Sequence, residues 1–287
     1  MSINIPLRLM IIKLKDAELN VETPHSSSEG ATPVVFLHGF TGSSRDWMFL
    51  FNRLPEGYSP YAIDIIGHGR SSSPADPSLY SAEAISNQIL GVIHYFNLKE
   101  VILAGYSMGG RAALSFAVEN PGLLKGLILE SSTAGIIDEN ERRERASSDL
   151  RLAEFIENNP IEAFADYWMD VPLFATLKKL PENVYAEVKK KKMLNSKTGL
   201  ANSLRGFSTG VMPQLWDKLK DINCRTMLIT GELDKKFTGI NIEMSRKIKL
   251  SEHEVIESAG HNTHLERPEN FLNLLNRFLT GLTKAEG

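Results

Sequence analysis

The sequence predicts an α/β domain with a mostly parallel central sheet, flanking helices and one helical insertion. Short apolar runs alternate with longer amphipathic stretches, as in βαβ units whose strands pair in parallel. A charged segment at 135–216 breaks this rhythm and contains no strand-like run. A serine flanked by glycines also stands between a strand-like run and a helical pattern. At 287 residues the chain is long enough for one large domain with a sizeable core.

Six apolar runs are the predicted strands of the sheet, and helical patterns at 82–96 and 111–119 lie between some of them. The runs are Pro33–Leu37, Tyr58–Ile66, Val101–Ala104, Gly126–Leu129, Thr226–Thr230 and Glu254–Ile256. Alternating apolar residues from Ile3 to Leu9 predict a further strand near the N-terminus. The run His25–Gly30 predicts the turn of an opening β-hairpin.

The segment 135–216 is predicted to form a helical cap. It is charged, but its aromatic residues, among them Phe155 and Phe164, recur too often for a disordered segment. We expect 1–134 and 217–287 to form the core domain, with the cap inserted between two strands of its sheet. Because ligands of α/β sheets bind beyond the carboxyl ends of the strands, a cap at that edge would roof the binding site.

The composition limits the classes of function. A net charge of −3 provides no overall field that attracts nucleic acid. No stretch of about 18 apolar residues and no signal-peptide pattern is present, so we expect a cytoplasmic protein without a membrane span. Cys224 is the only cysteine, which excludes an internal disulfide and a cysteine-based metal site, and its apolar surroundings predict a buried thiol.

No metal site and no cofactor is predicted, because the sequence contains neither a metal-ligand cluster nor a phosphate-cradling loop nor a dinucleotide fingerprint. The expected partner is therefore a small-molecule substrate. The sequence contains no signal for an oligomeric state.

The run Gly105–Gly109 is the strongest indication of chemistry. It follows the predicted strand Val101–Ala104 and precedes a helical pattern, which is the context of a nucleophile elbow. The small neighbours allow a turn so tight that the hydroxyl of Ser107 is exposed. A glycine-rich turn without chemistry is the alternative, and the two further motifs below argue against it.

A serine is a poor nucleophile or base until a histidine takes its proton. Among seven histidines we select His261, because it directly follows the last predicted strand and catalytic groups gather in such loops. His264, three residues later, is expected at a helix start or on the surface. His38 and His68 each stand beside a glycine, where a structural role is expected.

The histidine needs an acid that fixes its tautomer. Asp234 follows the predicted strand Thr226–Thr230, while Glu232 and Glu130 are weaker alternatives. The chain order Ser107, Asp234, His261 matches the α/β-hydrolase fold, which we therefore predict. A dehalogenase or epoxide hydrolase of this fold is excluded, because those enzymes use an aspartate nucleophile.

Stabilising an oxyanion requires hydrogen-bond donors, usually backbone N–H groups. The loop His38–Gly42 follows a predicted strand, and we expect its Phe40 to supply one donor. The residue after the serine, Met108, is expected to supply the other.

Longer runs carry a resemblance to a known family. They are His38–Trp47, Gly105–Arg111, Glu130–Ser132, Glu141–Arg145, Trp168 with Pro172–Phe174, Gly199–Gly206, Gly231–Phe237 and Gly260–Glu266. Through them the chain after Pro33 resembles the 2-succinyl-6-hydroxy-2,4-cyclohexadiene-1-carboxylate synthases of menaquinone biosynthesis. The runs within the predicted cap are more specific to that family than the first and last, which are partly shared across the fold.

The resemblance implies a cofactor-free lyase that eliminates pyruvate from 2-succinyl-5-enolpyruvyl-6-hydroxy-3-cyclohexene-1-carboxylate. His261 would make Ser107 a base that removes a ring proton. A polycarboxylate substrate needs fixed cations, and arginine offers bidentate donors. The residues that the resemblance assigns to substrate binding are Arg111, Arg145, Lys192, Tyr106, Trp168 and Phe174.

Each of these assignments has an alternative in the residues themselves. Arg111 and Arg145 could face solvent on helix surfaces, and the two cap aromatics could be cap core. Lys192 stands where the family has a second cap arginine, and lysine lacks the planar fork of arginine. The stretch Gly206–Trp216 also differs from the family pattern, with Met212 before Pro213.

Two other functions remain open at this level. A carboxylesterase or carbon–carbon bond hydrolase would use the same triad, with a more apolar cap. A ligand-binding receptor on this fold would show no turnover that depends on Ser107.

Overall fold

The computed structural model describes residues 7–25 and 30–283 and contains one eight-stranded sheet in the order β1-β2-β4-β3-β5-β6-β7-β8. β1 pairs antiparallel with β2, and β2 pairs antiparallel with β4. The other six strands run parallel to one another. The predicted α/β fold with a mostly parallel sheet is therefore confirmed.

The six parallel strands fall on the six predicted runs, with ends that differ by up to three residues. The strands are β1 Leu7–Lys13, β2 Glu18–Pro24, β3 Thr32–Leu37, β4 Tyr58–Ile63, β5 Val101–Tyr106, β6 Leu124–Glu130, β7 Arg225–Gly231 and β8 Ser251–Ile256. Every residue of β5 is buried, because helices cover both faces of the sheet. The central strands are therefore continuous apolar runs in the sequence.

The opening hairpin exists, but its predicted turn is wrong. Lys13 pairs with Glu18, and the Leu14 N–H donates to the carbonyl of Ala17 at 2.8 Å, so the chain turns at 14–17. In the sheet β2 lies between β1 and β4 and is not a neighbour of β3, so the two strands on either side of the predicted turn do not form a hairpin. Residues 1–6 and 26–29, which include part of both predictions, lie outside the described residues.

Helices on both faces build the two halves of the core. α1 (Ala82–Tyr95), α2 (Met108–Glu119) and α7 (Lys235–Lys247) pack on one face. η1 (Ser44–Leu50) and α9 (Pro268–Thr283) pack on the other. Shorter elements connect them: η2 Pro77–Tyr80, η3 Pro121–Leu123, η5 Trp216–Asp221 and α8 Thr263–Glu266.

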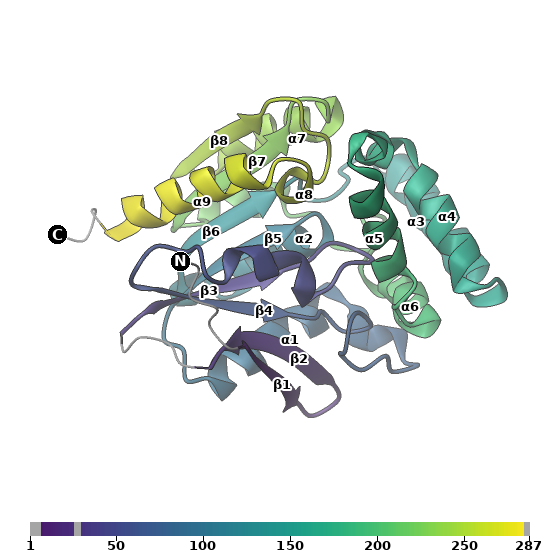
Figure 1. Cartoon of the computed structure of the whole chain (residues 1–287), viewed down its shortest axis with the longest axis horizontal. Helices are drawn as coiled ribbons and strands as arrows, with labels where there is room; N and C mark the ends of the chain where they lie inside the picture. The colour runs from purple at the N-terminus through teal and green to yellow at the C-terminus, as the bar shows by residue number, and fades with distance from the viewer. Residues whose placement is uncertain (1–6, 26–29, 284–287) are drawn as a thin grey trace.

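Between β6 and β7 the chain forms a purely helical insertion. Its elements are α3 Glu139–Asn158, α4 Ile161–Asp170, η4 Pro172–Lys179, α5 Glu182–Lys192 and α6 Lys197–Phe207. Figure 1 shows the four α-helices, in teal and green, grouped at one end of the sheet. A small apolar core that includes Ile156, Phe164 and Leu200 holds α3, α4 and α6 together, while α5 packs on a second cluster formed by Met169, Phe174 and Leu177.

Helix α6 of the insertion lies backbone to backbone against the core domain at Gly199 and at Gly206. A Cβ atom added to Gly199, in the first turn of α6, would lie 2.1 Å from the carbonyl oxygen of Gly67. Gly67 itself has a φ of +81°. Only glycine at both positions allows this approach without displacing α6.

Candidate active site

The tight turn between β5 and α2 presents Ser107. This residue has a φ of +50°, a strained conformation for a residue with a side chain. A Cβ atom on Gly105 would lie 2.3 Å from the carbonyl oxygen of Gly109, and one on Gly109 would lie 2.1 Å from that of Leu37. The turn therefore requires glycine at both positions, which is why the flanking glycines predicted it.

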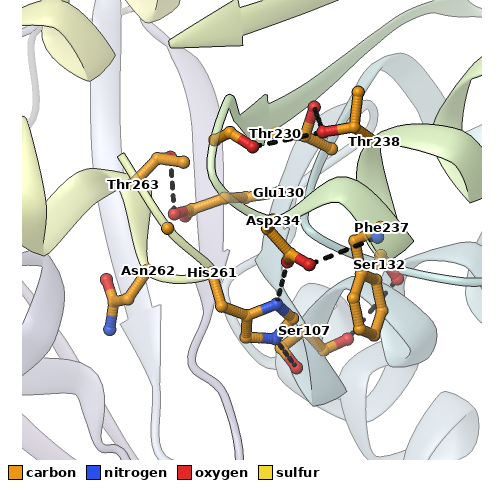
Figure 2. Close-up of polar contacts among 12 residues, drawn as sticks. Ser107, Glu130, Ser132, Thr230, Asp234, Phe237, Thr238, His261, Asn262 and Thr263 are labelled. Atoms are coloured by element: carbon orange, nitrogen blue, oxygen red, sulfur yellow. Dashed lines mark hydrogen bonds and ion pairs between the residues drawn. The ribbon is translucent and has the colours of Figure 1, made fainter. Parts of the chain in front are cut away.

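Ser107, His261 and Asp234 form a continuous chain of hydrogen bonds (Figure 2). The Ser107 hydroxyl lies 3.0 Å from His261 Nε2, and His261 Nδ1 donates to Asp234 Oδ2 at 2.6 Å. Asp234 also caps α7 by accepting from the backbone N–H of Phe237 at 3.3 Å. These contacts orient His261 so that Nε2 accepts the serine proton.

The alternative acids have other partners. Glu130, at the end of β6, accepts from Nδ1 of His264 at 2.7 Å and from its backbone N–H at 3.0 Å. Thr263 Oγ1 donates to the same carboxylate at 2.7 Å. Glu232 accepts from the backbone N–H of Ser258 at 2.9 Å. His264 lies at the start of α8 (Thr263–Glu266), as one of the two expectations for it has it, but it is not on the surface, because its side chain is buried against Glu130.

The expected oxyanion donors lie on the same cavity as the serine. Phe40 and Met108 both line it, and no described residue accepts a hydrogen bond from either backbone N–H. His38 fixes the loop that carries Phe40, because its Nδ1 contacts the carbonyl oxygen of Gly39 at 2.7 Å and its Nε2 accepts from Ile65 N at 2.9 Å. His38 thus has a structural partner on each ring nitrogen. These two contacts hold the loop that carries Phe40 in place.

The catalytic cavity has a volume of about 420 Å³ and lies between the core domain and the helical insertion. Arg111 and Arg145 both line it. Arg111 is buried, donates to the carbonyl oxygen of Phe207 and stacks over the Phe207 ring, with 4.8 Å to the centroid. Burial and the nearby charge of Arg145 lower the pKa of Arg111 to about 9, so it remains a cation at neutral pH. Arg145 Nε donates to Asp149 at 2.7 Å.

Lys192 does not line the cavity that contains Ser107. It lines a neighbouring cavity of about 520 Å³, and its ammonium group donates to Thr41 Oγ1 at 2.9 Å. The ammonium nitrogen lies 6.0 Å from the ring centroid of Phe174. The Phe174 side chain in turn lines the cavity that contains Ser107. Its burial lowers the pKa of Lys192 to about 8.

Aromatic rings form the walls around His261. Tyr106, Phe174 and Phe237 have ring centroids 5.5, 5.9 and 4.5 Å from that of His261. Trp168 packs on Phe40 with a centroid separation of 5.1 Å. The predicted pocket-lining residues Tyr106, Trp168 and Phe174 thus all meet at this cavity.

Sequence reasoning missed several residues that line the cavity, among them the polar residues Ser208, Thr209 and Lys236 and the aromatic residue Phe237. The position of Phe237 could have been inferred, because a helix-capping Asp234 binds the N–H three residues later. No local pattern marks Ser208 or Thr209, which reach the cavity only through the packing of α6 against α2.

The described residues contain no cluster of three or more His, Cys, Asp or Glu side chains that could hold a metal ion. In the same part of the chain, no helix is both long enough and apolar enough to cross a bilayer. Burial raises the pKa of Cys224 to about 11, which leaves little thiolate at neutral pH.

Known proteins resemble this chain in architecture and in sequence. The family described as the alpha/beta hydrolase fold matches residues 32–268. A relative from Bacillus subtilis (strain 168) is 40% identical over 87% of this chain and 90% of its own length, and carries the name 2-succinyl-6-hydroxy-2,4-cyclohexadiene-1-carboxylate synthase with a provisional prefix. The synthase of the same name from Enterobacter sp. (strain 638) is 32% identical over 82% of this chain and 86% of its own length.

Solved structures agree with these matches. The structure of MenH from S. aureus has a TM-score of 0.87 and 30% sequence identity, and the match covers 94% of this chain and 100% of that chain. A thermophilic esterase from Thermogutta terrifontis has a TM-score of 0.82 at 22% identity, covering 96% and 99% of the two chains, which shows a shared fold. The chain therefore belongs to the α/β hydrolase fold family and, within it, to the family of 2-succinyl-6-hydroxy-2,4-cyclohexadiene-1-carboxylate synthases.

Proposed function

We propose that this protein eliminates pyruvate from 2-succinyl-5-enolpyruvyl-6-hydroxy-3-cyclohexene-1-carboxylate to give 2-succinyl-6-hydroxy-2,4-cyclohexadiene-1-carboxylate in menaquinone biosynthesis. One observation carries the proposal beyond family membership: the cavity at Ser107 also contains two guanidinium groups, those of Arg111 and Arg145. A substrate with carboxylates on its ring, succinyl and enolpyruvyl groups suits such a cavity. A cavity for neutral esters has no need of cations on its wall.

The bond changes follow from the positions of the double bonds. The substrate has a ring double bond between C3 and C4, and the product has double bonds between C2 and C3 and between C4 and C5. Ser107, deprotonated by His261, removes the proton on C2, and the freed electron pair forms the C2–C3 bond. The former C3–C4 pair moves to C4–C5 and expels the oxygen on C5. The leaving enolpyruvate takes up a proton and becomes pyruvate.

The oxyanion donors have a role in this elimination. The C2 proton is adjacent to the ketone of the succinyl group, so its removal places negative charge on the ketone oxygen. Phe40 and Met108 line the cavity, and their N–H groups would donate to that oxygen. Asp234 stabilises the charged His261 in the meantime.

The helical insertion 135–216 serves as the cap of this site in our proposal, with 1–134 and 217–287 as the catalytic core. The cap supplies Arg145, Trp168 and Phe174 to the cavity, while the core supplies the triad. The aromatic side chains that line the cavity limit its contact with water, which strengthens the hydrogen bonds to the developing charge.

Pyruvate release tests this function. Wild-type protein and Ser107→Ala are incubated with the freshly prepared enolpyruvyl substrate, and pyruvate is measured through a coupled lactate dehydrogenase assay. We expect rapid release by the wild type and a loss of roughly a thousandfold or more in the variant, because the variant has no base.

A nitrophenyl ester assayed in parallel separates the alternatives. No pyruvate above the spontaneous background would overturn the lyase proposal. Fast ester cleavage that depends on Ser107 would then identify a hydrolase, and no turnover of either compound would favour a ligand-binding role.

A further inference from the structure

We call the loop His38–Gly42 the oxyanion loop, because it carries Phe40, whose N–H is the expected donor to an oxyanion. Thr41, the next residue, has a φ of +69°. Among the non-glycine residues of positive φ in the described part of the chain, only Thr41 has a β-branched side chain. Such a side chain is strained in this conformation, so the surrounding structure must hold Thr41 in it.

Two side chains of the helical insertion hold Thr41, and they come from the end of α5 and the turn after it. Nδ2 of Asn195 donates to the carbonyl oxygen of Thr41 at 3.0 Å, and the ammonium group of Lys192 donates to its Oγ1 at 2.9 Å. The first contact reaches the backbone of Thr41, whereas the second reaches only its side chain. Asn195 is therefore the residue that can orient the backbone next to the N–H of Phe40.

The amide of Asn195 is itself fixed. It is buried, and its Nδ2 also donates to the carbonyl oxygen of Lys192 at 3.2 Å. Its Oδ1 accepts from the backbone N–H of Gly69 at 3.4 Å. A buried amide with partners on both its nitrogen and its oxygen has one orientation, so the carbonyl group of Thr41 is held in one position.

The two ends of the oxyanion loop are held by different parts of the molecule. At its start, Nε2 of His38 accepts from a backbone N–H of the core domain at 2.9 Å. At its end, the contacts come from the insertion, where Asn195 binds Thr41. The ring of Phe40 also packs on Trp168 of the insertion, with 5.1 Å between the ring centroids. The N–H of Phe40 thus lies between a segment held by the core domain and a segment held by the insertion.

We propose that Asn195 is a positioning residue for the oxyanion hole. By binding the carbonyl group of Thr41 it stabilises the left-handed conformation of that residue, and this conformation directs the N–H of Phe40 to the cavity at Ser107. Asn195 does not line that cavity, so its effect on the reaction passes through the loop. The inference rests on the proposed function for the reaction that is measured, but the same donor would serve ester cleavage at Ser107.

The variant Asn195→Ala tests this role in the assay of pyruvate release. An oxyanion donor that is displaced, rather than removed, loses part of its effect on kcat. We expect kcat to fall about thirtyfold and KM to change by less than about threefold, because the groups that bind the substrate stay in place.

Thr41→Gly provides a second background for the same substitution. Glycine adopts a positive φ without strain, so the oxyanion loop of this variant does not depend on a contact with the insertion for its conformation. The kcat of Thr41→Gly is the reference, and adding Asn195→Ala to it is expected to lower kcat by about threefold or less. A fall of about thirtyfold in both backgrounds would overturn the inference, because the effect would then not depend on the conformation of Thr41.

Asn202→Ala is the matched control. Asn202 is also a buried asparagine of the insertion, and its Nδ2 donates to the carbonyl oxygens of Pro74 and Ala75 in the core domain, both at 3.1 Å. Neither of these acceptors belongs to the oxyanion loop. Both asparagine variants are expected to have lower unfolding temperatures, but only Asn195→Ala is expected to have a lower kcat. Equal losses of kcat in the two variants would overturn the positioning role and leave Asn195 a structural residue.

The remaining outcomes separate this inference from the proposed function. An Asn195→Ala variant with the kcat of the wild type would overturn the inference and leave the proposed function intact. A wild type that cleaves a nitrophenyl ester but releases no pyruvate would overturn the proposed function, and kcat for the ester then tests Asn195 with the same variants. A wild type that turns over neither compound would overturn both.

Discussion

Two cavities share the oxyanion loop, and the larger one does not contain the catalytic serine. Phe40 lines the cavity of about 420 Å³ at Ser107, while Thr41 lines its neighbour of about 520 Å³. Cationic side chains line both cavities, Arg111 and Arg145 in the first and Lys192 in the second. Each cavity also adjoins a buried histidine–carboxylate pair. His261 meets Asp234 at 2.6 Å on one side, and His264 meets Glu130 at 2.7 Å on the other.

The two pairs differ in what the histidine ring meets next. Nε2 of His261 contacts the hydroxyl of Ser107, whose strained turn holds it at the cavity. The ring of His264 is instead packed among aromatic rings, with centroids 4.4 Å from Trp47 and 5.0 Å from Tyr106. The pair His261–Asp234 can act in catalysis because the hydroxyl of Ser107 lies beside it. The pair His264–Glu130 is packed among aromatic rings and holds its loop in place.

Replacing each acid by its amide gives the sharpest contrast. Asp234→Asn is expected to lower kcat about ten-thousandfold, because the amide favours the histidine tautomer that cannot take the serine proton. The unfolding temperature is expected to change little. Pyruvate release and thermal unfolding are measured on the same sample, and a kcat within tenfold of wild type would contradict the proposed role of the triad.

Glu130→Gln is expected to act on stability instead. The carboxylate accepts three hydrogen bonds in a buried place, and the amide N–H of glutamine would point at one of these donors and leave it without an acceptor. We expect a loss of about 2 kcal/mol in the free energy of unfolding. This corresponds to roughly 4–8 °C in unfolding temperature for a domain of this size. A loss of activity equal to that of Asp234→Asn, with unchanged stability, would erase the distinction between the pairs.

Lys192→Met is expected to produce the smallest effect on catalysis, and its effect on stability depends on pH. Burial lowers the pKa of Lys192 from 10.5 to about 8 in the folded protein. Below pH 8 the lysine is charged in both states and the full cost of burying that charge is present. Between pH 8 and 10.5 the folded protein has released the proton that the unfolded chain still binds, so this cost is progressively lost.

The variant is therefore expected to be more stable than the wild type at pH 7, by about 3 kcal/mol, and equal to it above pH 10.5. Denaturant unfolding across this pH range measures the difference. The KM for pyruvate release serves as a control, because Lys192 lies on the neighbouring cavity. A large rise in KM would instead show that Lys192 binds a substrate carboxylate, as the family resemblance implies.

The sequence predicted the fold and the triad geometry because both depend on local signals placed at strand ends. Ser107, Asp234 and His261 each follow a recognisable apolar run, and parallel strands bring their carboxyl ends to one edge. The flanking glycines of the elbow are required by contacts under 3 Å, so a short motif was sufficient.

Positions that depend on packing between distant segments could not be predicted. Lys192 sits at the end of a helix with four consecutive lysines, and only the contact with Thr41 decides where its ammonium group lies. Ser208 and Thr209 reach the cavity through the contacts of Arg111 and Gly210, which no sequence pattern reveals. The turn of the first hairpin was misplaced because the glycine- and serine-rich run after β2 is a stronger turn signal than the short polar segment 14–17.

The contact between Gly67 and Gly199 restricts how the family can diverge. Neither position tolerates a methyl group unless α6 moves away from the sheet, and α6 carries the turn that holds Ser208. A substitution at either glycine would therefore change the wall of the catalytic cavity at a distance, through a displaced helix rather than a lost contact. Helices α4 and α5 contain no glycine, so among the described glycines neither helix has a comparable fixed approach to the core.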